Sequence, residues 1–166
     1  AFTLAAQKVN PDFTTQVVQI STWYDPAKEA DAARALLDQG ADIIAQHVDS
    51  PAALQVAEER GAFTFGQATD MASFAPKAHL TAIVDNWGPY YVERVQAALD
   101  GTWATSNVWL GMADGEVVIA PFRDNVPANV QARANEVIEG IKAGTFNVFA
   151  GPIYDQAGTL RVPEGE

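Results

Sequence analysis

Short apolar runs alternate with longer stretches of helical periodicity along most of the chain. Runs rich in Val, Ile, Phe or Thr predict four strands, at residues 17–20, 42–46, 63–65 and 80–84. The second of these runs is so apolar that we expect it to be buried on both faces of a sheet.

Helices are predicted between these strands by their start and stop residues. Asp25 is a good N-cap before Pro26, and the helix that they start should end at Gly40. Its buried stripe is expected at Ala30, Ala33 and Leu37. The same signals predict further helices from Ser50-Pro51 to Arg60-Gly61, from Gly88-Pro89 to Asp100-Gly101, and over 127–142.

Turn residues predict two hairpins in the remaining segments. One is expected around Asp114-Gly115, with short strands at 109–111 and 117–120, and the other around Gly158 after Gly151-Pro152. The chain opens with what reads as the last turns of a helix that Asn10-Pro11 stops. No strand precedes that helix, so we expect the chain to be an excised piece of a longer protein.

Strands that alternate with helices predict an α/β fold with a doubly wound, mostly parallel sheet. The carboxyl ends of parallel strands meet at one edge of such a sheet, where ligands bind. The turns at this edge carry the candidate site residues Trp23, Tyr24, His47, Asp49, Gln67, Asp70, Asp85 and Trp87. Because exposed loops seldom hold indole rings without a use, these turns predict a site for a planar ligand that forms hydrogen bonds.

Several of these residues also have a structural explanation, and the sequence leaves both open. Asp25 and Ser50 are helix N-caps first, with ligand contact as an addition. His47 fits a neutral, hydrogen-bonded structural histidine better than a contact residue. The aromatic residues could instead pack as satellite core at the sheet edge, namely Trp23, Tyr24 and Trp87.

Asp70 is the strongest single candidate for ligand contact. No helix that it could cap is recognisable, because the stretch over 73–76 reads as irregular. Asp85 could equally contact the ligand, cap a helix or pair with Arg94. His79 is expected in a loop on the solvated side and is given no role.

Composition narrows the class of function. The chain has 166 residues, with 10 Lys+Arg against 21 Asp+Glu, a formal net charge of -11 and no cysteine. The negative charge disfavours nucleic acid and anionic membrane surfaces as partners. The sequence contains no cysteine-based site and no nucleotide-binding or serine-hydrolase motif. We therefore expect binding without catalysis, metal or cofactor. The alternative is a small α/β enzyme or ligand-sensing domain that uses the aspartates at the carboxyl edge.

Several blocks occur in order along the chain: STWYDPAKE at 21–29, DQGADII at 38–44, QHVDSP at 46–51, TDM at 69–71, PKAHLT at 76–81, DNWGPYY at 85–91 and FAGPI at 149–153. Together they resemble the basic membrane protein (BMP) family of ABC-transporter substrate-binding lipoproteins, over nearly the whole chain.

This resemblance implies a type I periplasmic-binding-protein fold, in which two doubly wound lobes joined by three hinge crossings close on a small solute. Characterised members of the family bind purine nucleosides or related purines and deliver them to an ABC permease. The expected location is periplasmic or extracytoplasmic, with a lipoprotein anchor in the full-length parent.

By the same resemblance, residues 1–84 would be the second lobe, 85–145 a segment that crosses back toward the first lobe, and 146–166 a return crossing or hairpin. The first lobe would be mostly absent from the chain. The segment 85–145 would then lack its sheet partners in this chain. Another fragment, or a second copy that exchanges elements, would supply them in a fragment-completed or domain-swapped dimer.

The resemblance also assigns roles to individual positions. Asp70 matches the acidic position that the family uses toward the purine or sugar. Val48-Asp49 matches a turn that is glycine-rich in many relatives, so the larger side chains imply a different pocket. Asp85 stands where many relatives place a ligand-contacting Lys, and the reversed charge favours a base or another cationic or neutral ring. Ligand contacts are expected as stacking on Trp23, Tyr24 or Trp87 and as hydrogen bonds to Gln67 and Asp70.

Overall fold

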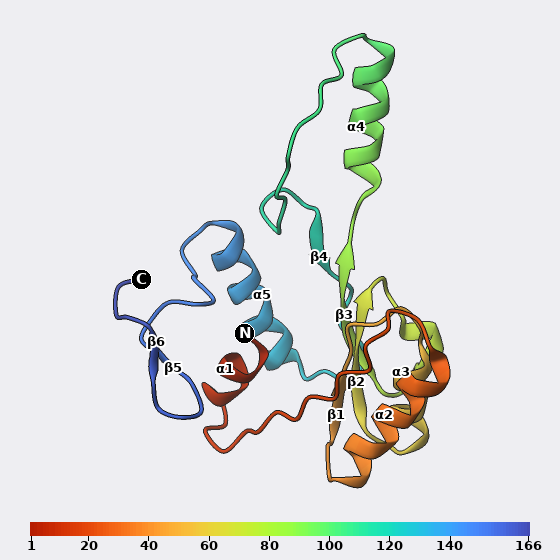
Figure 1. Cartoon of the computed structure of the whole chain (residues 1–166), viewed down its shortest axis with the longest axis vertical. Coiled ribbons are helices and arrows are strands. Elements are labelled where there is room, and N and C mark those ends of the chain that lie inside the picture. The colour runs from red at the N-terminus through yellow and green to blue at the C-terminus, as the bar shows by residue number, and fades with distance from the viewer. The chain divides into compact units, whose positions relative to one another are not determined.

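The computed structural model describes all residues, Ala1–Glu166, and divides into two compact units (Figure 1). The larger unit spans residues 18–133 and holds every predicted site residue. The smaller unit combines residues 1–17 with 134–166. No helix of the chain combines the length and the apolar character needed to cross a membrane.

A four-stranded sheet organises the larger unit. Its strands follow one another in chain order: β1 (Ile43–Ala45), β2 (Phe63–Ala68), β3 (His79–Asp85) and β4 (Val117–Ile119). The first three are parallel, and β4 is antiparallel to β3. Helices connect the parallel strands, so the predicted α/β fold with a mostly parallel sheet is confirmed.

The α-helices of the larger unit lie close to their predicted positions: α2 (Pro26–Asp38), α3 (Ala52–Glu59), α4 (Gly88–Leu99) and the first part of α5 (Ala128–Lys142). The sequence does not predict the short 3₁₀ helix η1 (Ala72–Phe74). α2 and α3 pack against each other beside the sheet, and α3 contacts β1 and β2 (Figure 1).

The start of α2 follows from its sequence. Asp25 is the N-cap, and its carboxylate accepts a hydrogen bond from the backbone N–H of Lys28 at 3.1 Å. Pro26 occupies the first turn, where no N–H is needed. Gly40 follows the helix with a φ of 94°, which a side chain would strain. These features confirm the predicted bounds of the helix.

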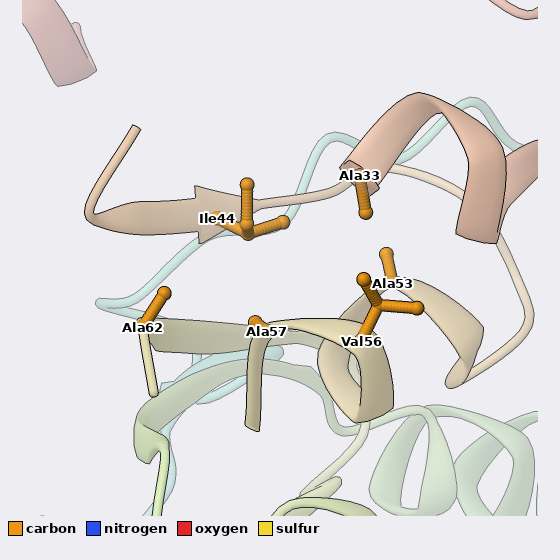
Figure 2. Packing of buried hydrophobic residues seen from close by; sticks show 6 residues of the cluster. All are labelled: Ala33, Ile44, Ala53, Val56, Ala57 and Ala62. Atoms are coloured by element: carbon orange, nitrogen blue, oxygen red, sulfur yellow. The ribbon is translucent and has the colours of Figure 1, made fainter. Parts of the chain in front are cut away.

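Small residues form the main core of the larger unit. Figure 2 shows residues of α2, β1 and α3 facing one another, and the buried set is Ala33, Ile44, Ala53, Val56, Ala57 and Ala62. Ala30 and Leu37 are half-buried against this set, so the predicted stripe of α2 is confirmed. A second cluster lies nearer the loop after β2 and consists of Leu54, Met71, Ala75 and Ala78.

The strand predicted over 17–20 is wrong. The segment pairs with no strand, and Val17 is 84% exposed. Backbone N–H and C=O groups form a strand only where a neighbour pairs with them, and β1 pairs with β2 alone. Because β1 lies at the sheet edge, its predicted burial on both faces is wrong as well: Ile44 is buried, but Ala45 is exposed.

The hairpin predicted around Asp114-Gly115 is also wrong, although the turn itself is present. Gly115 has a φ of 76°, and the N–H of Gly111 donates to the carboxylate of Asp114 at 2.9 Å. Residues 109–111 form no strand, because β4 pairs with β3 instead. β4 therefore pairs with β3, which lies earlier in the chain, and not with the neighbouring residues 109–111.

His79 lies in the core, where the sequence predicts a solvated loop. It is the first residue of β3 and is fully buried, at the position that pairs with Thr64 of β2. Burial lowers the pKa of the imidazole, because the charged form loses its hydration; the carboxylate of Asp70 opposes this effect, and Arg123 adds to it.

The smaller unit holds the greater part of α5 together with short elements. α1 (Phe2–Gln7) begins it, and β5 (Ile153–Tyr154) pairs antiparallel with β6 (Leu160–Val162). Gly158 lies in the turn between these strands with a φ of 76°, which confirms the predicted second hairpin.

A buried carboxylate joins the start of α2 to the loop after β1. Glu29 accepts from the backbone N–H of Asp25 at 3.0 Å, so the side chain closes back over the helix start. Its other oxygen accepts a hydrogen bond from the hydroxyl of Ser50. Both side chains are buried, so water does not substitute for either partner.

Changing Ser50 to Ala should lower the free energy of unfolding by about 1–3 kcal/mol, because it leaves a buried carboxylate oxygen without a donor. Urea denaturation of the full-length protein measures this. Ser106→Ala, at an exposed position, is the matched control and should change stability by less than about 0.5 kcal/mol. Equal stability of the two variants would contradict a structural role for the bond.

Stability should also depend on pH through His79. Because its folded pKa lies below the ordinary 6.5, the unfolded chain binds the proton first as the pH falls. The contribution of the neutral ring is therefore complete above about pH 6.5 and is lost progressively below it. Urea denaturation across this range should give a shallower pH dependence of the free energy of unfolding for His79→Gln than for the wild type. Identical slopes for the two proteins would contradict the assignment.

Candidate functional site

The candidate site lies where the loops after the parallel strands meet. β1, β2 and β3 run in the same direction, so residues 46–50, 69–71 and 86–87 leave the sheet at one edge. Residues 21–24 join them through a backbone hydrogen bond, from the N–H of Asp49 to the carbonyl of Trp23 at 2.9 Å. The structure thus brings the predicted aromatic and acidic positions to one edge of the larger unit.

Gln46 shapes the loop after β1. Its side-chain amide donates to the carbonyl of Ser50 at 3.0 Å and to that of Val48 at 3.4 Å, and it lies 3.6 Å from the sulfur of Met71. The loops after β1 and β2 are therefore linked. Sequence reasoning missed this residue; the only available signal was an amide directly after an apolar strand.

Trp23 and His47 form an exposed aromatic pair. Their ring centroids are 6.0 Å apart with planes tilted by 59°. Trp23 is 67% exposed and Tyr24 is 66% exposed, so the alternative that they are satellite core is wrong. His47 is exposed too, which rules out a buried structural role for it. Asp49 lies exposed in the same loop.

The two predicted N-caps have different outcomes. Asp25 caps α2, and the backbone N–H of Lys28 that it accepts lowers the pKa of its carboxyl group. Ser50 is not the N-cap of α3, because Pro51 holds that position. The hydroxyl of Ser50 instead donates to Glu29 and accepts weakly from the N–H of Ala52 at 3.3 Å.

Gln67 and Asp70 come from the end of β2 and the loop after it. Gln67 is half-buried within the strand, because β2 extends three residues beyond its predicted end, from Phe65 to Ala68. A short helix, η1, does follow Asp70, but Met71 is its N-cap and no side chain caps it. Asp70 therefore caps no helix, as expected, although its Oδ1 accepts from the N–H of Ala72 at 3.0 Å. Its side chain is nevertheless 47% exposed.

Asp85 and Trp87 follow β3 at the same edge. Asp85 ends the strand and is exposed, and neither structural alternative for it holds. The side-chain partner of Arg94 is Glu93 at 2.5 Å, and α4 has no side-chain cap. Trp87 combines packing with exposure, since its ring lies 5.8 Å from that of Tyr90 and remains 44% exposed.

The exposed groups of this edge are aromatic rings and carboxylates. Exposed ring faces come from Trp23 and Trp87, and exposed carboxylates come from Asp49, Asp70 and Asp85. No group of three or more His, Asp or Glu side chains is arranged to hold a metal ion. Rings stack on planar ligands, and carboxylates accept hydrogen bonds from ligand N–H and O–H groups.

Comparison with known proteins shows which family the chain resembles. The sequence model of the Bmp family, described as ABC transporter substrate-binding protein, PnrA-like, matches residues 1–147. A purine-binding protein of Brucella abortus (strain 2308) is 54% identical over 166 residues, which are all of this chain and 47% of that protein. A putative ABC transporter glucose-binding protein of Haloferax volcanii is 32% identical over 93% of this chain and 40% of that protein. The chain thus spans about half the length of these curated relatives or less.

Solved structures share the fold. A transcriptional activator of the comK gene from Bacillus halodurans matches with a TM-score of 0.75 and 21% identity, over 87% of this chain and 52% of that one. An ABC transporter solute-binding protein from Conexibacter woesei matches with a TM-score of 0.68 and 24% identity, over 87% of this chain and 49% of that one.

The family model and both curated relatives describe solute-binding proteins, which favours binding over the enzyme alternative. The blocks at 21–29, 46–51 and 85–91 that carry the resemblance in the sequence all lie within the matched range. The chain belongs to the Bmp family of PnrA-like ABC transporter substrate-binding proteins.

Proposed function

We propose that the protein is the solute-binding component of an ABC importer and captures a purine base or nucleoside at the carboxyl edge of β1, β2 and β3. The observation that carries this proposal is the convergence of exposed aromatic rings and carboxylates on that edge. The purine-binding relative at 54% identity supports the class of ligand.

The proposed contacts follow from the geometry of the loops. Trp23, Tyr24 and Trp87 offer ring faces for stacking, and His47 supports the ring of Trp23 at 6.0 Å. A stacked aromatic pair contributes about 0.5–1.5 kcal/mol beyond its buried area, so several contacts must act together. Hydrogen bonds to the edges of the ligand come from Asp49, Gln67, Asp70 and Asp85.

Charge at the edge selects among purine compounds. Three aspartates lie at this edge of a chain whose formal net charge is -11. The site therefore repels a phosphate group. The same carboxylates accept hydrogen bonds from the N–H groups of a base and the hydroxyls of a ribose. A base or nucleoside therefore fits this edge better than a nucleotide does.

The permease of the importer is the proposed protein partner. Substrate-binding proteins of this family work outside the cytoplasm. We propose a periplasmic or extracytoplasmic location with a lipoprotein anchor in the full-length protein.

The lobe arrangement is proposed as the resemblance implies: 1–84 in the second lobe, 85–145 in a crossing toward the first lobe, and 146–166 in the return. Support comes from α4, which has no buried residue. Its side chains Val92, Val95 and Leu99 are 71%, 60% and 77% exposed, and apolar residues at this spacing require a packing partner. The first lobe, or a second copy that exchanges elements, would cover them.

Calorimetry of the full-length protein with adenine, adenosine, guanosine, adenosine monophosphate and glucose tests the ligand class. At least one base or nucleoside should bind with a micromolar Kd, about -8 kcal/mol. Adenosine monophosphate should bind at least about tenfold more weakly than adenosine, because its phosphate meets the aspartates. Heat with glucose and none with any purine would contradict the purine assignment while leaving a solute-binding protein.

Changing Asp70 to Ala should weaken binding of that purine by about tenfold or more, because a charge-assisted hydrogen bond is lost. Asp70→Asn keeps an acceptor for the N–H of Ala72 and separates the loss of charge from any disturbance of η1. Asp31→Ala, at an exposed position in the middle of α2, removes the same charge as a matched control and should leave the Kd unchanged. Equal Kd values for Asp70→Ala and Asp31→Ala would exclude Asp70 from the site.

A further inference from the structure

His79 is a buried polar side chain beside the proposed ligand contact Asp70. It has no exposed surface, and neither of its ring nitrogens has a hydrogen-bond partner. The Oδ1 atom of Asp70 lies 3.8 Å from Nε2 of His79, which is beyond hydrogen-bond distance. Buried polar groups without partners are rare in folded proteins because they cost stability. A histidine in this environment therefore indicates a use other than packing.

The backbone of β2 passes close to the imidazole ring of His79 at Gly66. A Cβ atom on Gly66 of β2 would lie 2.9 Å from Nε2 of His79 and 2.7 Å from the Cβ of Ala82. Both distances are shorter than a side chain tolerates, so β2 passes this close to the imidazole only with glycine at that position. The same strand ends at Ala68, two residues before Asp70.

Few charged groups face His79. Asp70 acts on it from the loop after β2, and Arg123 acts on it from the segment after β4. Glu58 of α3 accepts hydrogen bonds from the backbone just before β3. β2, β4 and η1, which pack against β3, carry no titratable side chain. Burial lowers the pKa of the ring, so His79 is neutral at neutral pH.

We propose that His79 is a positioning residue for the ligand-binding carboxylate of Asp70, leaving that carboxylate free for the ligand when neutral and drawing it inward when protonated. This inference rests on the proposed function, since it assumes that Asp70 contacts the ligand. It concerns a residue that makes no ligand contact itself, because its side chain is fully buried.

The consequence follows from the hydrogen-bonding capacity of the two groups. The protonated imidazole donates through both nitrogens and attracts the carboxylate, so closing the 3.8 Å gap would form a charge-assisted hydrogen bond. Asp70 would then leave the position from which it accepts a ligand donor. Ligand binding and protonation of His79 therefore oppose each other, and by linkage each lowers the affinity for the other.

NMR titration of the ligand-free full-length protein tests the coupling directly. His79→Gln and His47→Gln identify the imidazole signals of the two histidines of this chain. The side-chain carboxyl carbon of Asp70 should shift with the titration of His79, and Asp70→Asn should lower the pKa of His79 measurably. A His79 titration that Asp70→Asn leaves unchanged would overturn the proposal.

Calorimetry with adenine as the probe tests the effect on binding. Between about pH 7.5 and pH 5 the wild-type Kd should rise by about fivefold or more, and that of His79→Gln should stay within about twofold. A purely structural histidine would change the affinity without changing its pH profile. The same pH profile in both proteins would therefore contradict the proposal.

The two tests separate the proposals. If neither adenine nor any other purine of the panel binds at either pH, the ligand assignment fails, while the NMR titration still decides the coupling between His79 and Asp70. If His79→Gln does not fold, the comparison of wild type with Asp70→Asn in the NMR titration decides it alone.

Discussion

The buried hydrogen bond from Ser50 to Glu29 is the constraint on which the candidate site depends. It joins the helix start that follows Trp23 and Tyr24 to the loop that carries His47 and Asp49. A buried carboxylate keeps its donors because water does not replace them. The two loops are therefore held next to each other, and so are the exposed rings of Trp23 and His47 that they carry.

Small side chains make this arrangement possible. The core between α2, β1 and α3 consists mostly of alanine, so the helices approach closely and their starting residues lie near the sheet edge. Close approach recurs at Gly66, where β2 leaves no room for a Cβ beside His79. Glu29 and Ser50 are buried beneath the loops that carry Trp23 and His47, and the buried His79, at the start of β3, lies beside Asp70.

The proposed two-lobe arrangement would explain why the elements of this chain differ in how well they are packed. The sheet with α2 and α3 has its own core, whereas α4 has no buried residue. Such a division fits a binding protein in which one lobe supplies only one wall of the ligand site. A single wall offers stacking faces and acceptors but encloses no ligand, so affinity depends on the second wall that closes over it.

Local signals in the sequence were sufficient for α2, α4 and most of the strand positions, because a cap such as Asp25 and a stop such as Gly40 act within one turn of the chain. They also placed the aromatic and acidic residues at the correct edge. Pairing over longer distances was decided only by the tertiary structure. In the structure, residues 17–20 pair with no strand, β4 pairs with β3, His79 is buried, and the hydroxyl of Ser50 donates a hydrogen bond to Glu29. The bond from Ser50 to Glu29 spans 21 positions and the pairing of β3 with β4 spans more than 30, and neither hydrophobic periodicity nor turn chemistry carries information over such distances.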